Sequence, residues 1–271
     1  MDVWFDSGSS WAGVMNTREQ LDYPADLYLE GSDQYRGWFN SSLITSVAAT
    51  GHAPYKNVLS QGFTLDGNGN KMSKSLGNFT TLHDMLTDYD DPMAIRYLLA
   101  TTHYRRPINY APDTLAQARA ALERIRTGYR NLQFRLADAV PGQDTVLETT
   151  IQQQVEAFEI AMDDDFNVPN AVAAIFELIT LANTYAEATT VYDGTVTKLL
   201  TTIETLMGVL GIDGLSGASD LTPEQRRLID ARAIARTSQD YQTSDELRDQ
   251  LKTLGIIIED TPQGQRWHRA K

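Results

Sequence analysis

The sequence contains no cysteine among its 271 residues. This absence excludes disulfide bonds and metal sites built on thiolates. Histidine is nearly as scarce, and its occurrences do not have the spacing of a metal-binding cluster: His52, His83, His103 and His268. We therefore expect no metal site, and in particular no zinc site.

Long apolar runs are also missing. No uninterrupted stretch approaches the roughly 20 residues that a membrane-spanning helix needs. Residues 1–6 do not have the pattern of a signal peptide. With 42% hydrophobic and 22% charged residues, we expect a soluble, cytoplasmic protein that makes no membrane contact. Its length allows one large or two modest domains.

Positive charge is scarce overall but locally concentrated. The 23 basic residues face 36 acidic ones, and the net charge of −13 argues against general nucleic-acid binding. Eight arginines nevertheless lie between Arg96 and Arg135, where the acids are Asp113 and Glu123. This segment is either a solvated helix face or a local contact surface for a phosphate backbone, and the sequence leaves both open.

One short segment combines two lysines with small hydroxyl residues. It reads Lys71-Met72-Ser73-Lys74-Ser75 and follows a stretch that contains Gly67 and Gly69. The glycines give the backbone freedom to close on a ligand. The lysines can neutralise phosphate oxygens. The pattern therefore predicts a phosphate-binding loop, with a solvated basic loop as the alternative.

The residues before this lysine loop predict a nucleotide-binding unit. Residues 3–10 favour a short strand followed by a loop, and residues 24–31 and 58–65 favour buried strands on either side of a helix at about 34–51. Parallel strands joined in this way bind ligands at their carboxyl ends. The side chains expected at that edge are Glu30, Asp33 and Gln34.

From residue 82 onward the pattern is helical. Between Leu115 and Leu136 the apolar residues recur every three or four positions, which predicts a core-facing stripe with the arginines mostly outside it. A polar linker at 213–219 precedes a capping box at Thr222, a further helix and a small hairpin around residues 261–264. The predicted fold is an α/β partial Rossmann-type half, a mainly α-helical bundle and a small terminal hairpin.

Several longer sequence motifs resemble those of a known family. Residues 71–75 are identical to the signature loop of class I aminoacyl-tRNA synthetases, KMSKS. Residues 2–10 and 29–39, DVWFDSGSS and LEGSDQYRGWF, resemble the isoleucyl type of this class. Residues 1 to about 78 are therefore similar to isoleucyl-tRNA synthetase.

The rest of the chain resembles the cysteinyl type. The motifs that show this resemblance are THYRRPINY at 102–110, AMDDDFNVP at 161–169 and EDTPQGQRW at 259–267. The two resemblances change over near the loop segment 71–78, which both types share. We interpret the change as the product of recombination or gene fusion at that segment.

The resemblance implies ATP-dependent activation of an amino acid and charging of tRNA. Lys74 would bind the ATP phosphates and Lys71 would assist, which makes these the implied catalytic residues. Glu30 would contact the aminoacyl-adenylate, together with Asp33 and Gln34. Ser73 and Ser75 would support closure of the loop. The candidates for tRNA contact are Arg105, Arg106, Arg126, Arg130, Arg266 and Trp267.

The resemblance also implies four domains. Residues 1–90 correspond to the carboxyl-terminal half of the catalytic Rossmann-type domain, and residues 91–140 to a helical stem-contact connection. Residues 141–215 correspond to a helical anticodon-side bundle, and residues 216–271 to a small α+β tRNA-binding domain. The implied substrates are ATP with magnesium, tRNA, and cysteine or isoleucine.

Two departures limit what this resemblance implies for catalysis. Class I enzymes also use a His-x-Gly-His motif in the first half of the nucleotide fold, and this sequence has none. The cysteinyl type holds a zinc ion with cysteine, histidine and glutamate, and this sequence has no cysteine. We expect a chain that is incomplete at its amino terminus and weak or inactive alone. Its nucleotide unit would leave a sheet edge and apolar faces uncovered.

These features leave several functions open. The leading hypothesis is a cysteine–tRNA ligase, and the alternative name is an isoleucine–tRNA ligase fragment. A non-catalytic tRNA-binding module and an inert recombinant product are hypotheses of a different class. The amino-terminal half could also be supplied in trans by another chain.

Overall fold

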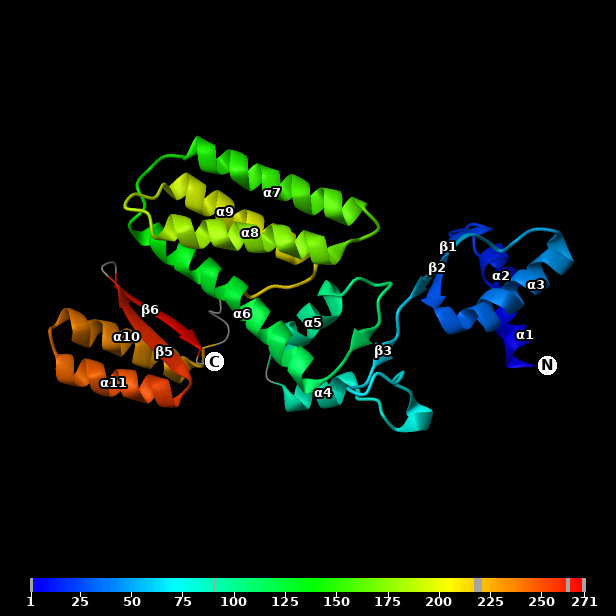
Figure 1. The fold of residues 1–271 in the computed structure, drawn as a ribbon, viewed down its shortest axis with the longest axis horizontal. Helices are drawn as coiled ribbons and strands as arrows, with labels where there is room; N and C mark the ends of the chain where they lie inside the picture. Colours follow the sequence, from blue (N-terminus) through cyan, green and yellow to red (C-terminus); the bar gives the residue numbers. More distant parts are fainter. Residues whose placement is uncertain (1, 90, 217–220, 262–263, 270–271) are drawn as a thin grey trace. The chain divides into compact units, whose positions relative to one another are not determined.

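The computed structural model describes residues 2–89, 91–216, 221–261 and 264–269 (Figure 1). The chain divides into two compact units. The first comprises Met1–Thr80 with His103–Ala111, and the second comprises Thr81–Thr102 with Pro112–Lys271. Residues 103–111, which we expected in the helical connection, thus belong to the same unit as the lysine loop.

The first unit contains the predicted crossover of parallel strands. Strand β1 (Ala25–Gly31) pairs in parallel with β2 (Tyr55–Gln61), with Leu29 opposite Leu59. A 3-10 helix (Ser32–Arg36) and then α3 (Trp38–Thr50) connect them, so the predicted strand, helix and strand are confirmed. Gly51 ends α3 with a φ of +76°, a conformation that glycine adopts without steric strain.

The start of the chain differs from the prediction. Residues 3–8, where we expected a strand and the start of a loop, form helix α1 (Val3–Gly8), followed by the short α2 (Ser10–Gly13) and a 3-10 helix (Met15–Thr17). The Asp2 carboxylate caps α1 by accepting a hydrogen bond from the Trp4 amide at 2.8 Å. A short apolar run does not by itself distinguish a strand from a helix, and here the capping aspartate favours the helix.

One face of the β1–β2 sheet is covered and the other is not. Tyr28 is 4% exposed and stacks on Trp38 of α3, with ring centroids 4.1 Å apart. On the opposite face, Leu27 and Leu29 remain 49% and 50% exposed. Parallel sheets are normally covered on both faces. The uncovered apolar face expected from the sequence is therefore present in this unit.

A second small sheet holds the segment after β2. The predicted strand 58–65 is interrupted at Gly62, beyond which β3 (Thr64–Leu65) pairs in parallel with β4 (Ile108–Asn109). The Gly62 amide donates to the Tyr104 carbonyl at 2.8 Å, and a Cβ at position 62 would lie 2.2 Å from the Arg106 carbonyl oxygen. Residue 62 must therefore lack a side chain for this crossing to form.

The second unit is helical, as predicted. Its helices are α4 (Leu82–Asp88), α5 (Pro92–Thr101), α6 (Pro112–Phe134), α7 (Thr145–Asp163), α8 (Val168–Ala186) and α9 (Asp193–Val209). Figure 1 shows α7, α8 and α9 running alongside one another. No described helix is both long enough and apolar enough to cross a membrane.

The predicted apolar stripe of α6 faces the bundle core. Leu122, Ile125 and Leu132 are completely buried and pack with residues of α8 and α9 in one cluster. The stripe ends before Leu136, which is 40% exposed in the 3-10 helix Arg135–Ala137. Helical spacing thus identified the buried face, but only as far as the helix itself extends.

The carboxyl-terminal part of the second unit has its own small core. Helices α10 (Pro223–Thr237) and α11 (Tyr241–Thr253) precede the antiparallel hairpin of β5 (Ile256–Thr261) and β6 (Gly264–Arg269), as predicted. Thr222 and Gln225 form the expected capping box. The buried residues of this core are Ile229, Leu251, Ile256 and Ile258.

The bundle core supplies a stability prediction. Ile175→Ala, at a fully buried position of α8, is expected to lower the free energy of unfolding by about 2–5 kcal/mol, because it leaves a cavity. Ile160→Ala is the matched control, because Ile160 on α7 is 69% exposed; its effect should stay within about 0.5 kcal/mol. Urea unfolding followed by far-UV circular dichroism measures both. Equal losses in the two variants would contradict this packing.

Candidate functional site: the lysine loop and the arginines

The lysine loop is built on β3 and a tight turn. After β3, the chain turns over residues 66–70 and returns so that Lys71 bridges back to Leu65 and the Met72 amide donates to the Thr64 carbonyl at 2.9 Å. The 3-10 helix Lys74–Leu76 follows, and Gly77 ends it with a φ of +65°. The glycine-containing stretch thus forms the turn, while the two lysines lie on its returning side.

Lys71 is held by two contacts within the first unit. Its Nζ lies 3.0 Å from Asp33 Oδ2 and 3.9 Å from the centroid of the Phe63 ring. Both side chains of the ion pair are about half exposed, at 46% for Lys71 and 50% for Asp33. Exposed pairs of this kind contribute little stability. Breaking the Lys71–Asp33 pair would therefore cost little stability.

Lys74 and the two serines differ in exposure, because Ser73 is partly buried. Lys74 and Ser75 are exposed, and the Ser73 and Ser75 hydroxyl oxygens lie 3.2 Å apart. The loop therefore presents one lysine bound to a carboxylate and a second lysine that is open to solvent. The phosphate-binding role of this loop stays a prediction.

The strand-end residues divide between two roles. Glu30 lies near the end of β1, opposite Ser60 of β2, and is exposed. Asp33, three residues further, reaches Lys71. The side-chain carbonyl of Gln34 instead accepts from the Trp38 amide at 2.9 Å, at the start of α3. Glu30 and Asp33 are thus accessible to a ligand, whereas the Gln34 oxygen is already used in capping α3.

Two residues of the loop were missed in the sequence reasoning. The Asn78 side chain donates to Asp66 Oδ2 at 2.8 Å and accepts from the Ser73 amide at 2.9 Å. The hydrogen bond from Asn78, followed by that from the Asn70 amide, lowers the pKa of Asp66. Asp66 begins a turn that is rich in glycine and asparagine, a recognisable signal, but nothing in the sequence indicates its partner twelve residues away.

The arginine-rich segment does not form one exposed face. Arg126 is 6% exposed and pairs with Asp91 at 2.6 Å, and the Arg130 side chain is 10% exposed and pairs with Glu123. Arg135, also 6% exposed, donates to the Ala186 and Ala188 carbonyls. The expected solvent-facing arginine surface is therefore wrong at these three positions. Arg126 and Arg130 are structural in this conformation.

The remaining tRNA-contact candidates differ in their surroundings. Arg105 and Arg106 are exposed in the first unit, where the Arg105 guanidinium lies 5.2 Å from the Tyr104 ring centroid. In the second unit Arg266 and Trp267 are partly buried. The Trp267 ring lies 5.0 Å from the Arg130 guanidinium, and Arg266 donates to the Asn131 side-chain oxygen at 3.3 Å.

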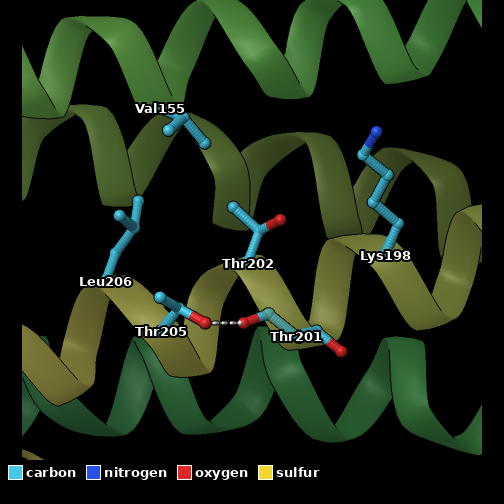
Figure 2. A pocket seen from close by; sticks show the side chains of 6 residues that line it. All are labelled: Val155, Lys198, Thr201, Thr202, Thr205 and Leu206. Atoms are coloured by element: carbon cyan, nitrogen blue, oxygen red, sulfur yellow. Dashed lines mark hydrogen bonds between the residues drawn. The ribbon is translucent and has the colours of Figure 1, made fainter.

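A pocket lies elsewhere, in a groove between α7 and α9 (Figure 2). It holds about 390 Å³ and is lined by Val155, Lys198, Thr201, Thr202, Thr205 and Leu206. Figure 2 shows that the Thr205 hydroxyl is turned back to the Thr201 carbonyl, to which it donates at 2.8 Å. None of the residues that we predicted to bind ATP, the adenylate or tRNA lines this groove.

Among the described residues, no group of three histidine, aspartate or glutamate side chains could hold a metal ion. The sequence has no cysteine to add to such a set. The residues present therefore do not fit the zinc site that the cysteinyl type uses. The expectation that no metal is bound stays a prediction.

The two kinds of ion pair supply a prediction. Burial opposes ionisation of Asp91, but the hydrogen bond and charge of Arg126, together with the Ala94 amide and the Arg119 charge, lower the Asp91 pKa. Asp91→Asn should lower the free energy of unfolding by about 3 kcal/mol, because it leaves the buried Arg126 charge without this carboxylate. Asparagine still caps α5, so capping is preserved. Asp33→Asn, at the exposed pair, should change stability by less than about 1 kcal/mol.

The stability that Asp91 contributes should depend on pH in a definite direction. Because the folded-state pKa of Asp91 is below its ordinary value of 3.8, its contribution is complete above that value and is lost as the pH falls through the folded-state pKa. The stability difference between the unaltered protein and Asp91→Asn should therefore shrink below about pH 4. Urea unfolding at pH 7 and at pH 3 measures it. A difference that stays constant would contradict the ion pair.

Comparison with known families assigns most of the chain. Residues 1–111 match the family described as tRNA synthetases class I (I, L, M and V). Residues 157–214 match the DALR domain, and residues 218–267 match the cysteinyl-tRNA ligase anticodon binding domain. The first match contains the lysine loop and β1 to β4, the second contains α8 and α9, and the third runs from α10 into β6.

Curated relatives of two kinds align with the chain. The cysteine–tRNA ligase of Leuconostoc citreum is 53% identical over 245 residues, which are 90% of this chain and 52% of the relative. That of Oenococcus oeni is 43% identical over 266 residues, or 97% of this chain and 56% of the relative. The isoleucine–tRNA ligase of Streptococcus pyogenes is 56% identical over 146 residues, or 54% of this chain and 16% of the relative.

These alignments overlap along the chain. The chain spans about half the length of the cysteine–tRNA ligases that it matches. Because the cysteine-type alignments cover at least 90% of the chain and the isoleucine-type alignment covers 54%, the two likenesses share residues. A changeover at residues 71–78 stays a prediction.

Two solved structures share the fold. The LeuRS of Agrobacterium radiobacter K84, solved as a ternary complex with tRNA and LeuAMS, has a TM-score of 0.55 at 24% identity and covers 79% of this chain and 32% of its own. The methionyl-tRNA synthetase of Mycobacterium tuberculosis, in complex with methionyl-adenylate, has a TM-score of 0.58 at 18% identity and covers 83% and 51%. Together with the family matches, these likenesses show that the chain carries a class I tRNA synthetase domain, followed by a DALR domain and a cysteinyl-tRNA ligase anticodon binding domain.

Proposed function

We propose that this chain is the part of a cysteine–tRNA ligase that binds the ATP phosphates and contacts tRNA. The observation that carries the proposal is the lysine loop. Lys74 is exposed, and the Lys71 ammonium pairs with the half-exposed carboxylate of Asp33, which follows β1. The named cysteine–tRNA ligases that align with 90% or more of the chain support the choice of ligase.

The proposed reaction is the attack of a cysteine carboxylate on the α-phosphate of ATP, with pyrophosphate leaving and magnesium accompanying the nucleotide. Negative charge builds on the leaving pyrophosphate in such a transition state, and fixed positive charge near it lowers the barrier. Lys74 would meet that charge directly. Lys71 would leave Asp33 for the same phosphates, while Glu30 would face the adenylate. Transfer of the cysteinyl group to tRNA would follow.

For tRNA contact we propose Arg105 and Arg106 in the first unit. Both are exposed, and guanidinium groups bind phosphate in a bidentate manner. In the second unit, Arg266 and Trp267 are the candidates within the segment that matches an anticodon-binding domain. Arg126 and Arg130 are left out of this proposal because their side chains are buried in ion pairs.

Isoleucine is the alternative substrate, supported by the 56% identity of 146 residues to an isoleucine–tRNA ligase. A third function is tRNA binding without catalysis, which is supported by the match of residues 218–267 to an anticodon binding domain. ATP–pyrophosphate exchange with each amino acid, alongside a tRNA gel shift, separates these functions. Exchange with neither amino acid, together with tRNA binding, would leave the binding module.

The role of the loop predicts the behaviour of a lysine variant. Lys74→Ala should lower cysteine-dependent ATP–pyrophosphate exchange by about 100-fold or more, the usual cost of removing one group that stabilises transition-state charge. Lys56→Ala is the control, because Lys56 is also an exposed lysine of the first unit and pairs with Asp26 at 2.6 Å. It should leave the exchange rate unchanged. An unaltered rate in Lys74→Ala would refute the assigned role.

The arginine pair predicts a salt-dependent effect. The double variant Arg105→Ala with Arg106→Ala should weaken tRNA binding at low salt and reduce the slope of log affinity against log salt by about one to two. Arg18→Ala with Arg227→Ala removes the same charge from other exposed positions and should change both much less. Filter binding at several salt concentrations gives the slopes. An equal loss in the two double variants would mean that only net charge matters.

A further inference from the structure

Hydrogen bonds of the Asp66 and Asn78 side chains join the two ends of the lysine loop. The Asn78 amide nitrogen donates to Asp66 Oδ2 at 2.8 Å and to the Lys71 carbonyl at 3.2 Å. Its side-chain oxygen accepts from the Ser73 amide at 2.9 Å. One asparagine therefore contacts the backbone on both sides of Met72. The part of the chain between the two lysines is tied to the end of the loop.

Asp66 holds the other half of the same ring of hydrogen bonds. Its Oδ1 accepts from the Asn68 amide at 3.0 Å and from the Asn70 amide at 2.8 Å. These bonds close the turn before Lys71, and the bond from Asn78 then connects the turn to the residue after Gly77. The φ of +65° at Gly77 brings the chain back toward the turn.

We propose that Asp66 and Asn78 are positioning residues, which hold Lys71 and the 3-10 turn that begins at Lys74 in the geometry that meets phosphate. This inference rests on the proposed phosphate-binding role of the loop. Neither side chain needs to touch the nucleotide. They act by fixing backbone that carries the two lysines, because an ordered loop loses less conformational entropy when it closes on a ligand.

Charge in the surroundings is consistent with this role. Asp33 draws Lys71 from one side, through an exposed ion pair that a phosphate can replace. Asp66 accepts hydrogen bonds from amide donors rather than pairing with a lysine. Its carboxylate is therefore used for structure and does not compete with phosphate for the Lys71 ammonium.

The test compares two asparagines of the same loop. Asn78→Ala should speed hydrogen exchange at the Ser73 amide by about tenfold, since it removes that amide's acceptor. It should also weaken the binding of inorganic pyrophosphate, measured by titration calorimetry, by about tenfold. Asn68→Ala is the matched control: its backbone amide still reaches Asp66, and its side chain lies outside the ring. Neither quantity should change in this variant.

A reciprocal exchange separates positioning from general loss of structure. Asp66→Asn combined with Asn78→Asp keeps a donor facing an acceptor between the two positions, and it keeps an acceptor for the Ser73 amide. This double variant should recover most of the pyrophosphate affinity that Asn78→Ala loses. The melting temperature should be the same in all variants, since the loop is largely exposed.

Each outcome decides one of the two hypotheses. The positioning role would be overturned if hydrogen exchange at the Ser73 amide is as slow in Asn78→Ala as in the unaltered protein. It would also be overturned if that variant keeps full pyrophosphate affinity. If the unaltered protein binds no pyrophosphate, the proposed function fails, and the positioning role fails with it even where exchange at Ser73 responds as expected. In that case the exchange data alone would show that Asn78 orders the loop for another purpose.

Discussion

The parallel pairing of β1 with β2 is the constraint on which the candidate site depends. Parallel strands need a crossover, and α3 supplies it, so both strands end at the same edge. Asp33 follows β1 at that edge, and the chain leaves β2 there toward the lysine loop. The absence of a side chain at Gly62 then lets the segment 103–109 cross close by. The Lys71–Asp33 contact is a consequence of this arrangement, although 38 residues separate the two in sequence.

Charge is used in two opposite ways in the two units. In the first unit the Lys71–Asp33 pair is half exposed, so it is weak and replaceable, as a ligand-binding group should be. In the second unit Arg126 and Arg135 are 6% exposed and bonded to a carboxylate or to carbonyl oxygens. A buried guanidinium needs polar partners, because desolvation of a charge without them is costly. At Arg126 and Arg135 the local excess of arginine therefore serves pairing inside the unit, whereas Arg105 and Arg106 of the same segment are exposed.

The domains of this chain are identified by its relatives, whereas the exposure of individual residues is decided by its structure. The family matches identify the domains, and the cysteine–tRNA ligase relatives align with nearly the whole chain while being about twice as long. The structure shows which residues of the matched segments are exposed to solvent and which are used in internal contacts. Lys74, Glu30 and Arg105 are exposed, whereas Gln34 caps α3 and Arg126 holds α5. The groove between α7 and α9 is lined by none of the residues predicted to bind ATP, the adenylate or tRNA.

The sequence by itself determined the crossover unit, the helical bundle, the hairpin and the lysine loop, because hydrophobic periodicity, glycines and caps are local signals. It was wrong at α1, where the short apolar run 3–5 fits either kind of element and the Asp2 cap favours a helix. Only the tertiary structure decided the partners of Arg126 and Lys71, and the joining of Asp66 to Asn78. Pairing and burial depend on which segments meet in space, and residues far apart in sequence carry no periodic signal of that meeting.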